Sequence, residues 1–207
     1  MRFSAALALV SLLAGSANAQ IDAVFTATGI GVEYAARMYR EIWNQHGQDI
    51  IDVLEARTCL PFDEPLVEAI VTEDTSNSGG PEHPMTLRAS YVREVKQSTL
   101  VHELGHRHLW KLEQRLDEVD GHMTLFLILD RVWADIWGAD FAEEAVGNEI
   151  GWHRRYAEAW TWARSLTDDE RARLWTELLN LNGFGSCGGL VNRSSGGSDG
   201  GMSVADR

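Results

Sequence analysis

The spacing of hydrophobic residues differs from one segment of the chain to the next. In residues 32–56 the apolar side chains recur at helical spacing, and Gly47 is the one position where the predicted helix could break. Residues 65–76 and 85–91 alternate apolar and polar side chains, which predicts two short strands. The Gly- and Pro-containing residues 76–84 between them predict a loop.

Beyond the second predicted strand the periodicity is helical. A first helix is expected to begin within residues 92–97, and a second, residues 122–137, is apolar on nearly every side and should be buried. A third covers residues 140–165, and a fourth, residues 167–183, opens with the capping box TDDE. We therefore predict an α+β fold, in which a small β-sheet with an edge strand packs on the first of these helices and a mainly α-helical C-terminal half follows.

The two ends of the chain differ from its middle. Residues 1–19 combine Arg2, an apolar run and small residues ending at Ala19, which is typical of a secretory signal peptide. We expect an exported protein, periplasmic or secreted after cleavage near Ala19, without stable membrane insertion because the apolar run is too short. Residues 185–207 are rich in Gly and Ser and predict a disordered tail, which leaves residues 20–184 as a single domain.

The charge balance and the cysteines restrict the partners and the chemistry only coarsely. The chain has 31 acidic and 18 basic residues and a net charge of −13, so nucleic acid and anionic lipid are not expected partners. The oligomeric state is left open. Cys59 and Cys187 could form one disulfide in an exported protein, or could be two independent thiols.

The segment TLVHELGHRHLW, residues 99–110, contains the residues with the most specific chemistry. His102 and His106 are four positions apart, so on a helix their side chains project from one face and can hold one zinc ion. Glu103 can reach a water molecule at that ion without binding the metal, which suits a general base. Gly105 leaves room where a larger side chain would crowd a neighbour.

With HELGH at residues 102–106, TLV directly before it and the predicted strand at 85–91, the chain resembles the zincin metallopeptidases, including uncharacterised exported bacterial members. The resemblance implies a Zn²⁺ cofactor and a peptide or protein substrate that lies extended along the edge strand. Arg107 departs from the zincin pattern, which prefers an uncharged residue after the second histidine. On a helix Arg107 would point away from the metal face.

A catalytic zinc site needs a third protein ligand, and His122 is the first candidate. The metzincin position, six residues after His106, is Leu112, and His108 would face away from the other two histidines. If the first helix ends near Leu112, the polar loop after it can bring His122 back beside His106. If the helix continues to Leu116, the third ligand must come from further along the chain.

Carboxylates are the next candidates. Glu143 or Glu144 would give the gluzincin arrangement, with an acid from a following helix. Asp130 could be a ligand, could accept the second N–H of a ligating histidine, or could pair with an arginine at the edge of the core. Cys59 could act as in peptide deformylases, but RTCLP lacks their surrounding motif and an exported chain has no formylated substrate.

These residues lead us to predict an exported zinc metallopeptidase in which His102, His106 and His122 hold zinc and Glu103 is the general base. Residues 153–156, His-Arg-Arg-Tyr, contain side chains able to stabilise a transition state, although a solvated basic face is the expected role of this segment.

Two alternatives belong to other classes of protein. One is a non-catalytic zinc-binding protein closed by a fourth ligand, His108 or His153. The other is a helical envelope protein that binds a partner through its Trp-rich half, with incidental histidines. The tryptophans of this half recur at helical spacing, which favours a role in the core. They are Trp133, Trp137, Trp152, Trp160, Trp162 and Trp175.

Overall fold

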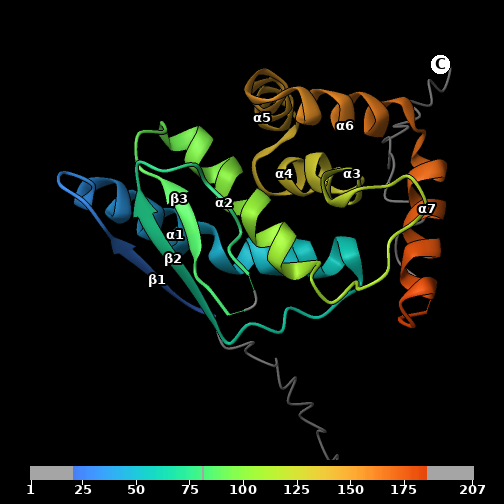
Figure 1. Ribbon diagram of the computed structural model, residues 1–207, viewed down its shortest axis with the longest axis horizontal. Coiled ribbons are helices and arrows are strands. Elements are labelled where there is room, and N and C mark those ends of the chain that lie inside the picture. The colour runs from blue at the N-terminus through green and yellow to red at the C-terminus, as the bar shows by residue number, and fades with distance from the viewer. Residues whose placement is uncertain (1–20, 81, 186–207) are drawn as a thin grey trace, which may run out of the picture.

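The computed structural model describes residues 21–80 and 82–185, and it has a small sheet at one side and a mainly helical C-terminal half at the other (Figure 1). This is the predicted α+β class. The predicted signal peptide, nearly all of the predicted tail and Cys187 lie outside the described residues. None of the helices within those residues is long and apolar enough to cross a membrane.

The sheet has three parallel strands in the order β1 (Asp22–Ala27), β2 (Leu66–Thr72) and β3 (Met85–Arg88). Strand β1 has no counterpart in the sequence prediction, whereas β2 and β3 fall within the two predicted strands. Parallel neighbours need long connections, and these are a helix between β1 and β2 and residues 73–84 between β2 and β3. Alternate residues of β2 are buried, so one face of the sheet forms core.

The connection between β1 and β2 is α1 (Glu33–Thr58), which packs against β1. It continues through Gly47, where the sequence allowed a break. A Cβ added to Gly47 would lie 2.7 Å from the indole ring of Trp43, so the missing side chain lets this ring lie flat on the helix. The aromatic ring covers the glycine and keeps its backbone out of water.

Helix α2 (Arg93–His108) contains the HELGH motif and lies at the centre of the molecule. It contacts β3, α1 and three helices of the C-terminal half, and most of its residues are buried. The helix ends at His108, and the chain turns back through residues 109–120. Asp120 then starts the next helix, α3 (Gly121–Phe126), by accepting a hydrogen bond from the backbone N–H of Met123 at 2.8 Å.

The two long helices predicted after α2 are each divided in two. Residues 122–137 form α3 and α4 (Leu129–Trp137), separated by a turn at residues 127–128. Residues 140–165 form α5 (Ala139–Trp152) and α6 (Arg154–Ser165). His153 lies between them with extended backbone, and its Nδ1 accepts a hydrogen bond from the Arg155 N–H at 3.1 Å. His153 thus caps α6 and divides the predicted helix at residues 140–165 into two.

The last helix, α7 (Asp168–Leu181), begins with the predicted capping box, in which Thr167 and Glu170 bond each other's backbone N–H groups. The expected aromatic core is also present: Trp133, Trp160 and Trp175 are at most 1% exposed. Trp152 is an exception, since it is 40% exposed at the end of α5. The ring of Trp152 stacks on that of Tyr91.

Gly105 allows α2 and α3 to pack closely, and this contact predicts a difference between two glycine substitutions. A Cβ on Gly105 would lie 2.6 Å from Cδ1 of the fully buried Leu125, whereas Gly147 on α5 has open space around it. Gly147→Ala should stabilise the protein by about 0.5–1 kcal/mol through helix propensity. Gly105→Ala gains the same propensity, but crowding should cost about 1–3 kcal/mol.

Urea unfolding of both variants measures this difference. Gly105→Ala should have the lower midpoint, and equal stabilisation by both substitutions would show that α3 accommodates the added methyl group.

Candidate metal centre and active site

Three histidine side chains converge between α2 and α3. His102 and His106 lie one turn apart on α2, and their Nε2 atoms are 3.1 Å apart. His122, in the first turn of α3, places its ring centre 4.8 Å from that of His106 and 5.7 Å from that of His102. One nitrogen from each ring lies within 4.8 Å of the others, and within the described parts of the chain this is the one group of His, Cys, Asp or Glu side chains so arranged.

The early end of α2 makes this arrangement possible. Because α2 stops at His108, the following residues fold into a short turn in which the Leu112 N–H bonds the Leu109 carbonyl oxygen. Both leucines are at most 3% exposed and fix the turn to the core. The chain therefore returns beside His106. The sequence analysis expected this return, and with it His122 as the third ligand, only for a helix that ends near Leu112 or earlier.

The structure places the other ligand candidates elsewhere. Of the three roles left open for Asp130, the structure shows the pairing with an arginine, since both its carboxylate oxygens accept from Nη1 of Arg171, at 2.9 and 3.1 Å. Glu143 pairs with Arg164 on the surface, and Glu144 is exposed. Cys59 ends α1 and does not belong to the histidine group.

His108 also faces away from the metal centre, as its helical position predicts. Its Nε2 lies 2.7 Å from Oγ1 of Thr58, and its ring stacks on Phe62. This contact joins the end of α2 to the end of α1.

A carboxylate that the sequence analysis missed orients the first histidine. Nδ1–H of His102 donates to Oε1 of Glu149 at 2.6 Å, and Nε1–H of Trp160 donates to Oε2 at 2.8 Å. With the proton on Nδ1, the Nε2 lone pair of His102 is free to point at a metal ion. Asp130, which was considered for this role, is engaged by an arginine instead.

The sequence did contain a signal for Glu149. On α5 it extends the buried series Ala142, Ala145 and Val146 at the spacing i, i+3, i+4, i+7. An acid in a core position needs a buried partner, and here it has two donors.

Burial and nearby charges shift the pKa values of His102 and His106 in opposite directions. Burial opposes protonation of His102, but the adjacent Glu149 carboxylate outweighs it and raises the pKa of His102 to about 9. A positive charge is therefore favoured at this ring, and a metal ion at Nε2 can supply it in place of a proton. Burial, together with the charge on His102, lowers the pKa of His106 to about 2, so that ring is neutral and keeps a lone pair for a metal.

The donor set also matches the geometry of zinc. Two nitrogen atoms bound to one tetrahedral zinc ion at ~2.0–2.1 Å are roughly 3.3 Å apart. The separation of 3.1 Å between Nε2 of His102 and Nε2 of His106 is close to that value. Three histidines are a donor set found in catalytic zinc sites, and one of the three, His102, lines a cavity.

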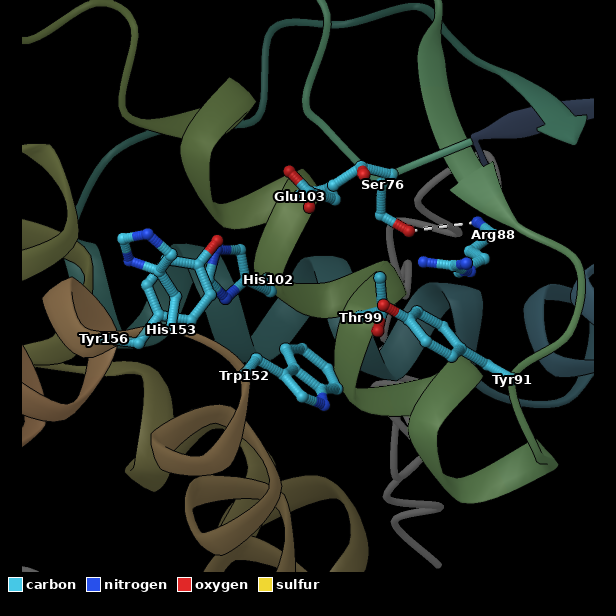
Figure 2. Close-up of a pocket in the computed structure, with 10 residues that line it drawn as sticks. Ser76, Arg88, Tyr91, Thr99, His102, Glu103, Trp152, His153 and Tyr156 are labelled. Carbon is cyan, nitrogen blue, oxygen red and sulfur yellow. Dashed lines mark hydrogen bonds between the residues drawn. The ribbon is translucent and has the colours of Figure 1, made fainter. Parts of the chain in front are cut away.

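Glu103 lies beside His102 and lines a cavity of about 450 Å³ (Figure 2). The residue is 6% exposed, and burial raises the pKa of its carboxyl group to about 7. A carboxyl group with such a pKa can both accept and return a proton near neutral pH.

Tyr156 of α6 closes the same end of the cavity. Its ring centre lies 4.6 Å from that of His122 and 5.6 Å from that of His102. Burial raises the pKa of its hydroxyl to about 12, so the group remains a hydrogen-bond donor. The expected solvated basic face is thus only partly present: Arg154 and Arg155 are exposed, whereas His153 and Tyr156 line the cavity.

The outer edge of β3 is not free to bind an extended peptide. Thr86 exchanges two backbone hydrogen bonds with Asn77, at 2.9 and 3.0 Å, and the Arg88 N–H donates to Oγ of Ser76 at 3.0 Å. The extended segment 75–77 therefore covers the strand that the zincin resemblance assigned to substrate binding. Thr75 and Ser76 of this segment line the cavity together with Arg88, the last residue of β3.

Arg107, the departure from the zincin pattern, holds this covering loop. Its Nε donates to both carboxylate oxygens of Glu64, at 2.7 and 2.9 Å. Its Nη1 donates to the carbonyl oxygens of Ser78 and His83, each at 2.9 Å. The charged residue thus points away from the histidines and fixes residues 73–84 against α2.

Comparison of the chain with models of protein families, with characterised proteins and with solved structures finds no match.

The Glu149–His102 contact predicts the response of metal affinity to one substitution. Glu149→Gln should weaken zinc binding by about 10–100-fold, because the amide is a weaker acceptor for the ring that must point Nε2 at the ion. Glu143→Gln, on the exposed face of the same helix, should leave the affinity unchanged. Competition with a chromophoric chelator measures both values, and identical affinities in parent and Glu149→Gln would contradict the role of this carboxylate.

The position of His122 predicts a loss of stoichiometric metal. We expect one equivalent of zinc per parent chain after dialysis and well below one in His122→Ala, measured by elemental analysis. Asp130→Asn and Glu144→Gln should both retain the ion, because their side chains lie away from the three histidines. Full occupancy in His122→Ala would remove it from the ligand set.

Proposed function

We propose that this protein is an exported zinc-dependent metallohydrolase of zincin type that hydrolyses peptide bonds. One observation supports this above all: the buried acid Glu103 lines the same cavity as His102, one of the three clustered histidines. A metal-storage site has no need of a carboxylic acid held beside the ligands with a pKa of about 7.

Glu103, Glu149 and Tyr156 each have a role in such a reaction. When bound, zinc supplies Lewis acidity, which polarises a carbonyl group and makes water reactive near neutral pH. Glu103 accepts the proton from the attacking water and later gives it to the departing amine. Glu149 keeps His102 in the tautomer that presents Nε2, and the Tyr156 hydroxyl can donate a hydrogen bond to the carbonyl oxygen as it gains negative charge.

A peptide is the substrate that best matches the walls of the cavity. Asn77 pairs its backbone with Thr86 of β3, so the neighbouring Ser76, which lines the cavity, turns its backbone groups away from β3. An extended chain in the cavity can pair with these groups, as in other forms of strand addition. The volume of about 450 Å³ lies at the lower end of the range for ligand sites and fits a short stretch of peptide rather than a folded domain.

The two alternatives have less support. A closed zinc site needs a fourth ligand, but His108 bonds Thr58, and His153 lies outside the group of three histidines. A partner surface made of tryptophan is at odds with the burial of Trp133, Trp160 and Trp175.

Glu103→Gln tests the mechanism with little change of shape. The variant should keep one equivalent of zinc, because Glu103 is not a ligand, and should lose about 10²–10⁴-fold in kcat, because no other base is positioned to take the proton. The readout is mass-spectrometric depletion of a mixed tetrapeptide library. Glu143→Gln serves as the control for loss of one carboxylate. Turnover by zinc-loaded Glu103→Gln at the parent rate would falsify the assignment.

A further inference from the structure

The cationic side chain of Arg88 lies across the cavity from His102 and His153 (Figure 2). Figure 2 shows Arg88, at the end of β3, on the opposite side from His153 and Tyr156. It is the one Arg or Lys among the residues that line this cavity. Within residues 21–80 and 82–185 the side chain of Arg88 has one hydrogen bond, from Nε–H to Oγ of Ser90 at 3.3 Å, and it forms no salt bridge.

Other arginines near Arg88 are paired with acidic side chains, whereas Arg88 is not. Arg107 is paired with Glu64 at 2.7 Å, and Arg93 lies 3.6 Å from Glu41. In a chain with a net charge of −13, acidic partners are plentiful. A guanidinium group that lines a cavity and has none of them presents its paired N–H donors to whatever enters, and that geometry matches a carboxylate.

Two stacked aromatic rings stand next to this cation. Tyr91 and Trp152 are parallel, with ring centres 5.5 Å apart and an angle of 2° between the planes. The guanidinium carbon of Arg88 lies 5.9 Å from the centre of the Tyr91 ring. Both rings line the cavity, and Trp152 is 40% exposed although the tryptophans of the core are covered. The cation is thus bordered by an apolar wall.

We propose that Arg88 binds a carboxylate of the substrate and that Tyr91 and Trp152 hold the apolar part of the same residue. This inference rests on the proposed peptidase function and adds a substrate class to it: short peptides with an anionic group near the cleaved bond. The carboxylate is either the C-terminus of the peptide or an acidic side chain, and the two sources are chemically equivalent for Arg88.

Four tetrapeptide libraries separate these sources. Two end in a free carboxylate and two in an amide, and within each pair one contains Asp and Glu while the other has Asn and Gln at the same positions. Depletion by the zinc-loaded parent chain gives relative kcat/KM values. A preference for free C-termini identifies the terminal carboxylate, and a preference for Asp and Glu that survives amidation identifies the side chain.

Three variants assign the preference to Arg88. Arg88→Met should lower kcat/KM for the favoured library about 10–100-fold, mainly through KM, and leave the other libraries nearly unchanged. Arg88→Lys keeps the charge and should restore part of the preference. Arg93→Met removes the same charge outside the cavity and should behave as the parent. Equal rates on all four libraries, or equal effects of Arg88→Met and Arg93→Met, overturn the proposal.

Binding separates this inference from the peptidase proposal. If no library is hydrolysed, the peptidase function fails, and the libraries are passed over immobilised zinc-loaded Glu103→Gln with and without Arg88→Met. Carboxylate-dependent retention that needs Arg88 supports the anion site in the absence of catalysis. Retention that ignores the carboxylate or the arginine overturns it.

Discussion

The buried contact between Glu149 and His102 is the interaction on which the rest of the site depends. A carboxylate that is fully buried must be matched by donors, and Glu149 has two, from α2 and from α6. The bond joins the helix that bears the motif to the C-terminal half. It also fixes the tautomer of His102, so the same contact that makes the core tolerate a charge directs a nitrogen lone pair toward the other two histidines.

Close packing of α3 on α2 gives the second constraint. His122 belongs to a different helix from His106, so their rings meet only if the helices approach closely. Gly105 permits this approach opposite Leu125, and the end of α2 at His108 lets the chain return within a short turn. The glycine of HELGH therefore acts through helix packing, because it lets α3 approach α2 opposite Leu125.

The sequence predicted most of the local structure and the three histidines that cluster in the fold, because helical spacing, capping and alternation are local properties. It predicted the α+β class, the capping box at Thr167, the positions of β2 and β3, and a helix through the HELGH segment, although it left both ends of that helix open. It missed β1, whose single buried residue, Phe25, gives a weak pattern. It also merged α5 with α6, because the helix break depends on the backbone of His153. Glu149 was missed because its partners lie 47 and 11 residues away, so only the folded chain shows why that position tolerates an acid.

The covered edge of β3 links the unusual Arg107 to the shape of the cavity. An uncharged residue after the second histidine could not bond Glu64 and two loop carbonyls at once. Without these bonds the loop at residues 73–84 would lose its contacts with Arg107 of α2, and the bonds of Asn77 and Ser76 to β3 would have to keep the strand edge covered. Thr75 and Ser76 of this loop border the cavity beside Arg88, the last residue of β3. The helix that carries HELGH therefore holds in place a loop that forms part of the cavity wall.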